Sequence, residues 1–367
     1  MRLLVGVFLA LVFFGVSPAQ DNTSDAKVFS VGAILPLTGP LSEYGVAFKH
    51  GIEMAKVANP GNFQQITFSF EDSRYEPKIA VNLFNALSRD SAVNLVIVWG
   101  NPPSEAVAAI AERDKIPTIA GAMNPKVSIG REYVIRANNQ DSMFSEVLAT
   151  YLKREGYSKI GMALTDNSYL TGILAGLIGA LPKDVSLEII DKYEPADTDF
   201  QSTVTKLKSS DYDAIGVFLM SGQIAKFYRQ FSSQGMTVPT FGTDFFESST
   251  EVRLSQGAME GAVYAQLGVS PEFRKTYMKR YGNDLQLAYA GNAYDIANLL
   301  AHTFGDGTTK AAEAIIESLK KSPPRNGVSG PFRYRLTEQG GAYFEFPIYM
   351  KQIKGKDFVR LPQMSAN

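Results

Sequence analysis

The chain has 367 residues, and its 36 Lys and Arg against 37 Asp and Glu give a formal net charge of −1. This balance leaves no basic excess to hold a nucleic-acid backbone, so nucleic acid is disfavoured as a partner. The 45% hydrophobic and 20% charged residues are typical of a globular protein, and the length favours about two domains. The chain has no Cys, which excludes thiolate nucleophiles, disulfides, Cys-ligated zinc and the lipid attachment of a bacterial lipoprotein.

Residues 1–19 are typical of a cleavable signal peptide. Met1 and Arg2 form a short positive region, an apolar run extends from Leu3 to Val16, and Ser17-Pro18-Ala19 is a small-x-small cleavage pattern. The apolar run is shorter than the roughly 18 residues that a membrane-spanning helix needs, so an uncleaved anchor is the weaker alternative. We expect an exported, periplasmic protein that is not a lipoprotein.

From Val28 onwards, short runs rich in Val, Ile and Phe alternate with segments of helical period. This pattern predicts βαβ units around a parallel sheet. In the first series we expect strands at 28–35, 66–70, 94–99, 117–120 and 133–136, and helices at 42–58, 77–89 and 104–113. Ser42 is expected to cap the first helix, and Pro77 favours the start of the second.

The same alternation starts afresh near Gln140. There we expect helices at 142–155, 170–181, 200–209 and 224–234, and strands at 159–164, 187–193, 214–219, 239–242 and 262–265. Helices at 272–281, 288–304 and 310–321 and strands at 331–335, 343–350 and 358–361 follow. Since no Gly/Ser/Pro linker separates the two series, we expect two close-set lobes and a cleft between them. Ligands of open α/β sheets bind beyond the carboxyl ends of the strands.

The sequence does not indicate catalysis. It has no P-loop, no His-Glu-x-x-His, no Gly-x-Ser-x-Gly and no strand-bound Gly-x-Gly-x-x-Gly. His50 and His302 each lack a second His three or four residues away. The Glu71-Asp72 pair follows a strand, where loops normally carry solvated carboxylates. We therefore expect no enzyme, no metal site and no cofactor.

Three loops that follow predicted strands contain candidate ligand-binding residues. Ser104 lies at the start of a helix, where free N–H groups and its hydroxyl can bind a carboxylate, or where the residue simply caps the helix. The segment 121–125 is small and bent, so its backbone can approach a ligand. Asp244 stands between aromatic residues, where an ammonium-bearing ligand would compensate its charge; alternatively, it is an exposed capping residue.

The chain from 28 to 361 resembles the periplasmic branched-chain amino-acid-binding proteins, the type I solute-binding family of ABC importers. The motifs that carry this resemblance are 31–40 with Tyr44-Gly45, Glu71-Asp72 with Pro77-Lys78, and Val328-Ser329-Gly330-Pro331-Phe332. The resemblance implies an α/β fold of the type I periplasmic-binding-protein class, with two Rossmann-like lobes and parallel sheets. It implies three hinge crossovers, near 136–139, 266–269 and 336–340. The N-terminal lobe would comprise 28–137 plus 268–337, and the C-terminal lobe 138–267 plus 338–361.

The resemblance also implies roles for individual residues. Ser104 matches a Ser that holds the ligand carboxylate, Ala122 a residue that offers it a backbone group, and Asp244 an acid that binds the ligand ammonium. Asn124 stands where Thr or Ser is usual. Tyr44, Tyr169 and Tyr289 match aromatic positions that line or cover the ligand. Departures from the family pattern are Pro102-Pro103, Met123 beside the carboxylate site, and Met220 at the position of a ligand-contacting Tyr.

We therefore expect a monomeric binding protein that captures an amino acid or similar small carboxylate and delivers it to an ABC transporter permease. Two alternatives remain. The protein could instead report its ligand to a membrane receptor, or its ligand could be an aromatic carboxylate, an amide or a urea-like solute.

Overall fold

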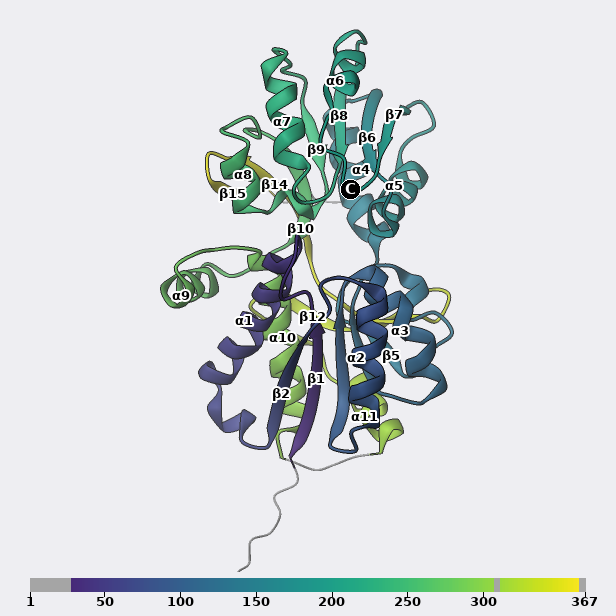
Figure 1. Ribbon diagram of the computed structural model, residues 1–367, viewed down its shortest axis with the longest axis vertical. Helices are drawn as coiled ribbons and strands as arrows, with labels where there is room; N and C mark the ends of the chain where they lie inside the picture. The colour runs from purple at the N-terminus through teal and green to yellow at the C-terminus, as the bar shows by residue number, and fades with distance from the viewer. Residues whose placement is uncertain (1–27, 307–310, 363–367) are drawn as a thin grey trace, which may run out of the picture.

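The computed structural model describes residues 28–306 and 311–362 and folds them into two α/β lobes, one above the other in Figure 1. This arrangement confirms the two-lobed fold expected from the sequence. The predicted signal peptide, 1–19, lies outside the described residues. Within those residues, no helix has the length and apolar character needed to cross a membrane.

The first lobe is built on an eight-stranded sheet in the order β11-β12-β13-β5-β4-β3-β1-β2. Its strands are β1 (Phe29–Leu35), β2 (Ile66–Asp72), β3 (Val93–Trp99), β4 (Thr118–Gly121), β5 (Val134–Arg136), β11 (Arg325–Gly327), β12 (Gly330–Leu336) and β13 (Ala342–Glu345). Pairing is parallel from β2 through β13, and β11 and β12 add antiparallel strands at one edge.

Helices cover both faces of this sheet. They are α1 (Ser42–Ala58), α2 (Pro77–Arg89), α3 (Asn101–Arg113), α10 (Leu287–Phe304) and α11 (Ala312–Lys320). Leu95 and Ile97 of β3 belong to the core cluster that contains α1 and α10, whereas Val96 and Val98 pack with α2 and α3. Because both faces are covered, β3 is a nearly continuous apolar run rather than an alternating one.

The second lobe contains a seven-stranded sheet in the order β15-β14-β10-β9-β8-β6-β7. Its strands are β6 (Lys159–Thr165), β7 (Ser186–Tyr193), β8 (Ala214–Phe218), β9 (Thr240–Gly242), β10 (Val263–Leu267), β14 (Ile348–Lys354) and β15 (Asp357–Arg360). Its helices are α4 (Asp141–Arg154), α5 (Ser168–Ala180), α6 (Gln201–Lys208), α7 (Ile224–Ser233) and α8 (Ser249–Leu254). Helix α9 (Pro271–Tyr281) projects sideways at the junction of the lobes (Figure 1), and its Phe273 and Tyr277 pack on the first lobe.

Two glycines allow α1 to pack closely in the first lobe. A Cβ atom at Gly45 would lie 2.1 Å from the carbonyl oxygen of Pro36, and one at Gly51 would lie 2.1 Å from that of Ala290. No larger residue fits at either position without a backbone shift. This packing positions the N-terminal end of α1, with Tyr44, at the junction between the lobes.

Three segments join the lobes, and one of them differs from the prediction. The first, residues 137–140, joins β5 to α4, and the second begins at Gly268 after β10. The third is Phe346-Pro347, between β13 and β14. The crossover expected near 336–340 is wrong, because Thr337 N–H bonds to the Gly341 carbonyl oxygen in a turn that returns the chain to the same sheet.

This turn also changes two related predictions. Residues 342–345 form β13, which pairs with β12 and β5, so they belong to the first lobe rather than the second. The single strand expected at 343–350 is two strands in different sheets. Pro347 lies between them, where the absence of an N–H group interrupts the ladder.

Candidate ligand site between the lobes

The carboxyl ends of several strands meet at a small cavity between the lobes. The cavity measures about 30 Å³ and is lined by residues of both lobes and of the first crossover: Tyr75, Trp99, Gly100, Asn101, Gly121, Met123, Asn138, Tyr169, Phe245, Tyr289 and Asn292. This space is comparable with one or two water molecules. A solute the size of an amino acid therefore enters only if the lobes part or the lining side chains move.

Six aromatic side chains surround the cavity, and we call them the aromatic cage: Tyr44, Tyr75, Trp99, Tyr169, Phe245 and Tyr289. The Trp99 ring lies 5.5 Å from that of Tyr44 and 5.4 Å from that of Tyr289. In the second lobe, the Tyr169 and Phe245 rings are 5.3 Å apart in an edge-to-face arrangement. Such contacts fix the ring positions, so the cage presents π-faces and edges rather than mobile side chains.

Asp244 is buried against this cage. It opens the 3₁₀ turn Asp244–Phe246 directly after β9 and is 1% exposed. Its two carboxylate oxygens accept hydrogen bonds from the hydroxyls of Tyr169 and Tyr289, which come from different lobes. Burial therefore rules out the alternative of an exposed capping residue.

The electrostatics at Asp244 are unfavourable for its charge. Burial raises the pKa of its carboxyl to about 6, although the two tyrosine hydrogen bonds act in the opposite direction. The charged side chain that acts on it is Glu247, another acid, whose own ion-pair partner is Lys351 at 2.6 Å. Among the described residues no Lys, Arg or His forms an ion pair with Asp244, so the carboxylate is buried without a countercharge.

A strained loop carries Tyr75 to the cavity. Arg74 and Tyr75 both have left-handed backbone conformations, with φ of 52° and 65°, which L-residues adopt at an energetic cost. The carboxylate of Asp72 stabilises this loop, because it accepts from Arg74 N–H at 2.9 Å and from Leu37 N–H at 2.8 Å. Burial alone would raise the pKa of Asp72, but these hydrogen bonds, with a stronger one from the Thr38 hydroxyl, hold it below its usual range. The Asp72 singled out in the sequence thus organises two loops that border the site.

Two further hydrogen bonds cross between the lobes near the cavity. The hydroxyls of Tyr44 and Ser221 are 2.9 Å apart, and Ser248 donates to the Glu43 carboxylate at 3.1 Å. Together with Tyr289 and Asp244, they connect α1 and α10 of the first lobe to loops of the second lobe. Separation of the lobes would break all three contacts.

The predicted site residues fall into two groups. Met123, Tyr169 and Tyr289 line the cavity, Asp244 bonds to both tyrosines, and Tyr44 completes the cage. The others do not line it. The hydroxyl of Ser104, a fully buried residue, donates to the Val98 carbonyl oxygen, and Ala122 packs with α2 and α3.

Asn124 and Met220 also form hydrogen bonds away from the cavity. Asn124 donates to Glu105 at 2.7 Å and accepts from Lys126 N–H at 3.0 Å. Met220 has its N–H bonded to the side chain of Gln223 at 3.0 Å. The expected carboxylate site around Ser104 and Asn124 is therefore not assembled in this arrangement.

Several lining residues were not singled out from the sequence: Tyr75, Trp99, Asn101, Asn138, Phe245 and Asn292. Trp99 is the last residue of β3, and Phe245 lies three residues after the end of β9; this position at a strand end is the available signal for a ligand contact. Asn138 lies on the first crossover, and Asn292 donates to the Ala137 carbonyl oxygen on the same crossover at 2.9 Å. Nothing local in the sequence distinguishes such asparagines from surface ones.

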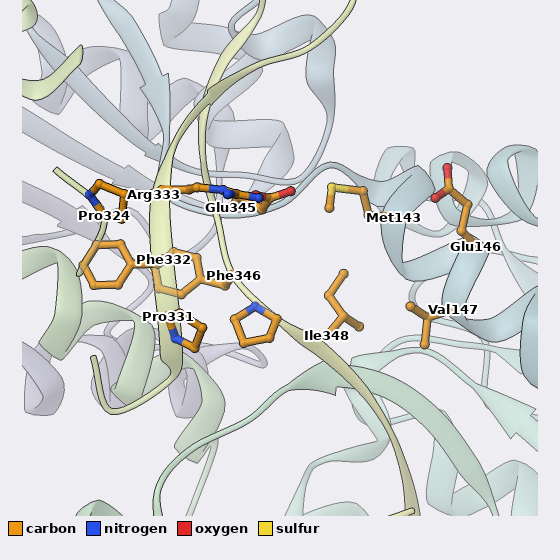
Figure 2. A pocket seen from close by; sticks show the side chains of 11 residues that line it. Met143, Glu146, Val147, Pro324, Pro331, Phe332, Arg333, Glu345, Phe346 and Ile348 are labelled. Atoms are coloured by element: carbon orange, nitrogen blue, oxygen red, sulfur yellow. The ribbon is translucent and has the colours of Figure 1, made fainter. Parts of the chain in front are cut away.

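Larger hollows lie elsewhere, and one of about 500 Å³ lies near the crossovers. Figure 2 shows its walls: Pro324, Pro331, Phe332 and Phe346 lie on one side, and Met143, Glu146 and Val147 of α4 on the other. Its basic residue, Arg333, is paired with Glu345 at 2.7 Å. The cavity between the lobes is the better ligand-site candidate, because a buried, uncompensated charge and aromatic rings converge there.

His50 packs against two tyrosines rather than facing the cavity. His50 stacks on Tyr281 with ring centroids 3.6 Å apart, and its Nδ1 lies 3.0 Å from the Tyr277 hydroxyl. Within the described ranges, no group of three or more His, Asp or Glu side chains is arranged to hold a metal ion.

Two α/β lobes, three crossovers and a polar site between facing strand ends define a bilobed solute-binding protein. The sequence profile of the periplasmic binding protein family matches residues 29–357, and the chain belongs to this family. The resemblance found in the sequence is thereby confirmed. Several of the solved structures with this fold are described as solute-binding proteins of ABC transporters.

Individual relatives agree with this assignment. The Leu/Ile/Val-binding protein homolog 3 of Brucella melitensis is 25% identical over 355 residues, which are 92% of this chain and 94% of that protein. The leucine-binding protein LivK of Thermotoga maritima has a TM-score of 0.81 at 23% identity and covers 91% of this chain and 98% of its own. An R. palustris solute-binding protein in complex with benzoate has a TM-score of 0.79 at 19% identity, over 91% and 95% of the two chains. At these identities the two solved structures establish a common fold.

Proposed function

We propose that this protein, exported to the periplasm, captures a small solute with a positively charged nitrogen between its lobes and delivers it as a monomer to an ABC importer. The observation that carries this proposal is Asp244, a buried carboxylate without a cationic partner among the described residues. A desolvated charge of this kind is costly unless a cation compensates it. A ligand ammonium would supply that cation.

The geometry at Asp244 leaves room for such an interaction. A carboxylate offers about four lone-pair positions, and Tyr169 and Tyr289 use one on each oxygen. The aromatic cage adds ring faces, which attract cations electrostatically. Because Tyr289 and Asp244 belong to different lobes, a cation held there would contact both lobes and favour their closed arrangement.

The names of relatives include binders of leucine and of benzoate, which share a carboxylate rather than an amine. An amino acid, which the sequence led us to expect as the ligand, has the positively charged nitrogen that this proposal requires. A binding site for its carboxylate has less support, because Ser104 and Asn124 are bonded within the first lobe.

Native mass spectrometry of the purified mature protein, followed by denaturation and identification of the released molecule, tests the proposal. We expect an amine-bearing compound from the wild-type protein and none from the Asp244→Asn variant. Release of a compound without a basic nitrogen would contradict the assignment of Asp244. Capture of permease subunits in a pull-down would support transport, whereas capture of a membrane receptor alone would favour sensing.

A further inference from the structure

The start of helix α3 has few free hydrogen-bond donors for an anion. Pro102 and Pro103 have no N–H group, and the N–H of Ser104 donates to the Gly100 carbonyl oxygen at 3.0 Å. The Ser104 hydroxyl donates to Val98 at 3.1 Å. A helix start binds a carboxylate through free N–H and hydroxyl groups. These three residues offer none to a solute in the cavity.

The Asn101 side chain accepts hydrogen bonds from two backbone N–H groups that follow β4. Its Oδ1 accepts from Met123 N–H at 2.8 Å and from Asn124 N–H at 3.3 Å. Because both partners are donors, the oxygen of the amide must face them and the NH₂ group must face away. The side-chain carbonyl thus stands where the oxygens of a carboxylate would bind to these two amides.

The NH₂ group of the Asn101 side chain has no hydrogen-bond partner among the described atoms. Asn101 lines the cavity and is 4% exposed, and its Nδ2 is buried with no hydrogen-bond partner among the described atoms. A buried donor of this kind is unfavourable until it is paired. It could donate to one neutral acceptor of a ligand, such as a hydroxyl or ether oxygen.

The charges around the cavity also oppose a carboxylate. None of the described lining residues is Lys, Arg or His, and the acids nearby are Asp244 and, beyond Asn124, Glu105. The buried guanidinium of Arg136 lies behind the lining, where it donates to the Met123 carbonyl oxygen at 3.1 Å and faces an acid of its own, Asp141. A ligand carboxylate would be desolvated beside these acids without a countercharge on any lining residue. An organic cation meets the opposite conditions, since Asp244 and the aromatic rings both attract it.

We infer that the ligand is a small organic cation without a carboxylate, an amine or quaternary ammonium compound with at most one neutral acceptor. Asn101 is the residue that determines this specificity. The inference rests on the proposed function, because it assumes that the solute binds in the cavity beside Asp244. It narrows the proposed ligand from any small solute with a positively charged nitrogen to one that has no carboxylate.

Isothermal titration calorimetry with matched compounds tests this inference. One series is leucine, 3-methylbutylamine and 4-methylpentanoate; the other is phenylalanine, 2-phenylethylamine and 3-phenylpropanoate; choline represents the quaternary class. We expect an amine or choline to bind at least about tenfold more tightly than either amino acid, with no binding of the two acids. Tighter binding of an amino acid or of an acid would overturn the inference but leave solute binding intact. If no amine and no choline binds, the inference is also overturned.

A variant of Asn101 separates its role from that of the cage. Asn101→Ala frees the N–H groups of Met123 and Asn124, so we expect the affinity for the amino acid to rise at least about tenfold relative to the matched amine. Asn59→Ala is the control, because the Asn59 side chain donates to Asn298 at 2.8 Å within the first lobe, away from the cavity. The ratio should stay unchanged in the control. An unchanged ratio in a folded Asn101→Ala protein would contradict the role of Asn101.

The proposed function and this inference fail in different ways. If native mass spectrometry finds no retained solute and none of the seven probes binds, both are contradicted. If leucine or 3-phenylpropanoate binds tightly, the solute-binding function stands and only the inference on ligand class fails.

Discussion

The side-chain amide of Asn139 pairs with both backbone polar groups of Phe346. Its Nδ2 donates to the Phe346 carbonyl oxygen at 2.7 Å, and the Phe346 N–H donates to its Oδ1 at 2.8 Å. The two residues are 0% and 2% exposed. Asn139 belongs to the first crossover and Phe346 to the third, so this pair joins two of the three segments that connect the lobes.

Asn139→Ala is expected to lower the free energy of unfolding by about 2–4 kcal/mol. The substitution leaves a buried N–H and a buried carbonyl oxygen unpaired, each at about 1–3 kcal/mol. Urea unfolding followed by circular dichroism measures the change. Asn59→Ala, which removes a partly buried side-chain pair, should lower it by about 1 kcal/mol. Equal effects of the two substitutions would show that the pairing of Asn139 with Phe346 contributes no more to the free energy of unfolding than a partly buried side-chain pair.

Ser104→Ala is expected to reduce stability without changing ligand affinity. The Ser104 hydroxyl donates to the Val98 carbonyl oxygen at a fully buried position, so its loss should lower the free energy of unfolding by about 1 kcal/mol. A direct role as a carboxylate donor would instead weaken binding by about 1–3 kcal/mol. Calorimetric titration of the variant with the released ligand distinguishes the two roles, and a weakened affinity would restore Ser104 to the binding site.

Much of the fold could be predicted because its signals are local. Helices α1 and α2 have the predicted bounds, 42–58 and 77–89, since helical period and Pro77 mark them within the sequence itself. The third crossover could not be placed in this way. Residues 343–350 read as one apolar run, and only the pairing of β13 with β5, which lies some 200 residues earlier, assigns its two halves to different sheets.

The site could be predicted from the sequence less completely than the fold. Helix α3 was expected to begin at Ser104 but begins at Asn101, and this shift of three residues buries Ser104 and brings Asn101 to the cavity. Proline is favourable in the first turn of a helix, which explains why Pro102-Pro103 continue the helix rather than precede it. Asp244 was found because a carboxylate among aromatic residues suits a cation, and Tyr44, Tyr169 and Tyr289 were found through the family resemblance. Tyr75 depends on two left-handed residues that no sequence pattern indicates.

Ligand binding is expected to change the intrinsic fluorescence of the protein. Trp99 is the single tryptophan of the chain, lines the cavity and is 5% exposed. A solute in the aromatic cage must contact or displace its neighbours Tyr75 and Tyr289, which changes the polarity around the indole. Titration of the wild-type protein should give a saturable shift, and Trp99→Phe should lose the signal while calorimetry still detects binding. If calorimetry detects binding but the fluorescence of Trp99 does not change, the ligand binds outside the aromatic cage.

Gly100→Ala is expected to disturb both stability and binding. Gly100 has φ of 98°, and a Cβ atom there would lie 2.4 Å from Cε2 of Tyr75. The strain and the displacement of Tyr75 should together lower the free energy of unfolding by about 2–3 kcal/mol and reduce ligand affinity at least about tenfold, or 1.4 kcal/mol.

Gly130→Ala is the matched control for this substitution. Its φ is 70°, also left-handed, but nothing lies within 4 Å of the added Cβ atom. It should cost about 1 kcal/mol of stability and leave binding unchanged. Thermal unfolding and calorimetry of both variants check the comparison, and equal affinities would show that Tyr75 does not contact the ligand.

Asp244→Asn should stabilise the protein at pH 7 while weakening cation binding. Burial raises the pKa of Asp244 from 3.8 to about 6, so the folded chain holds this proton more tightly than the unfolded chain. Stability is therefore lost as pH rises from about 4 to about 6, and the ionised group costs about 3 kcal/mol at pH 7. Asn removes most of that cost, so the variant should exceed the wild type in stability at pH 7 and match it near pH 4.

Cation affinity should show the opposite dependence. Below pH 6 the wild-type carboxyl is protonated in the free protein, so affinity for an amine should fall about tenfold per pH unit, whereas the affinity of Asp244→Asn should be independent of pH in this range. At pH 7 the variant should bind more weakly by about 2–5 kcal/mol. Asp295, whose pKa burial also raises to about 6, titrates alike in both proteins, so the difference between them isolates Asp244. A wild-type affinity that stays constant from pH 5 to 7 would exclude Asp244 as the group that holds the cation.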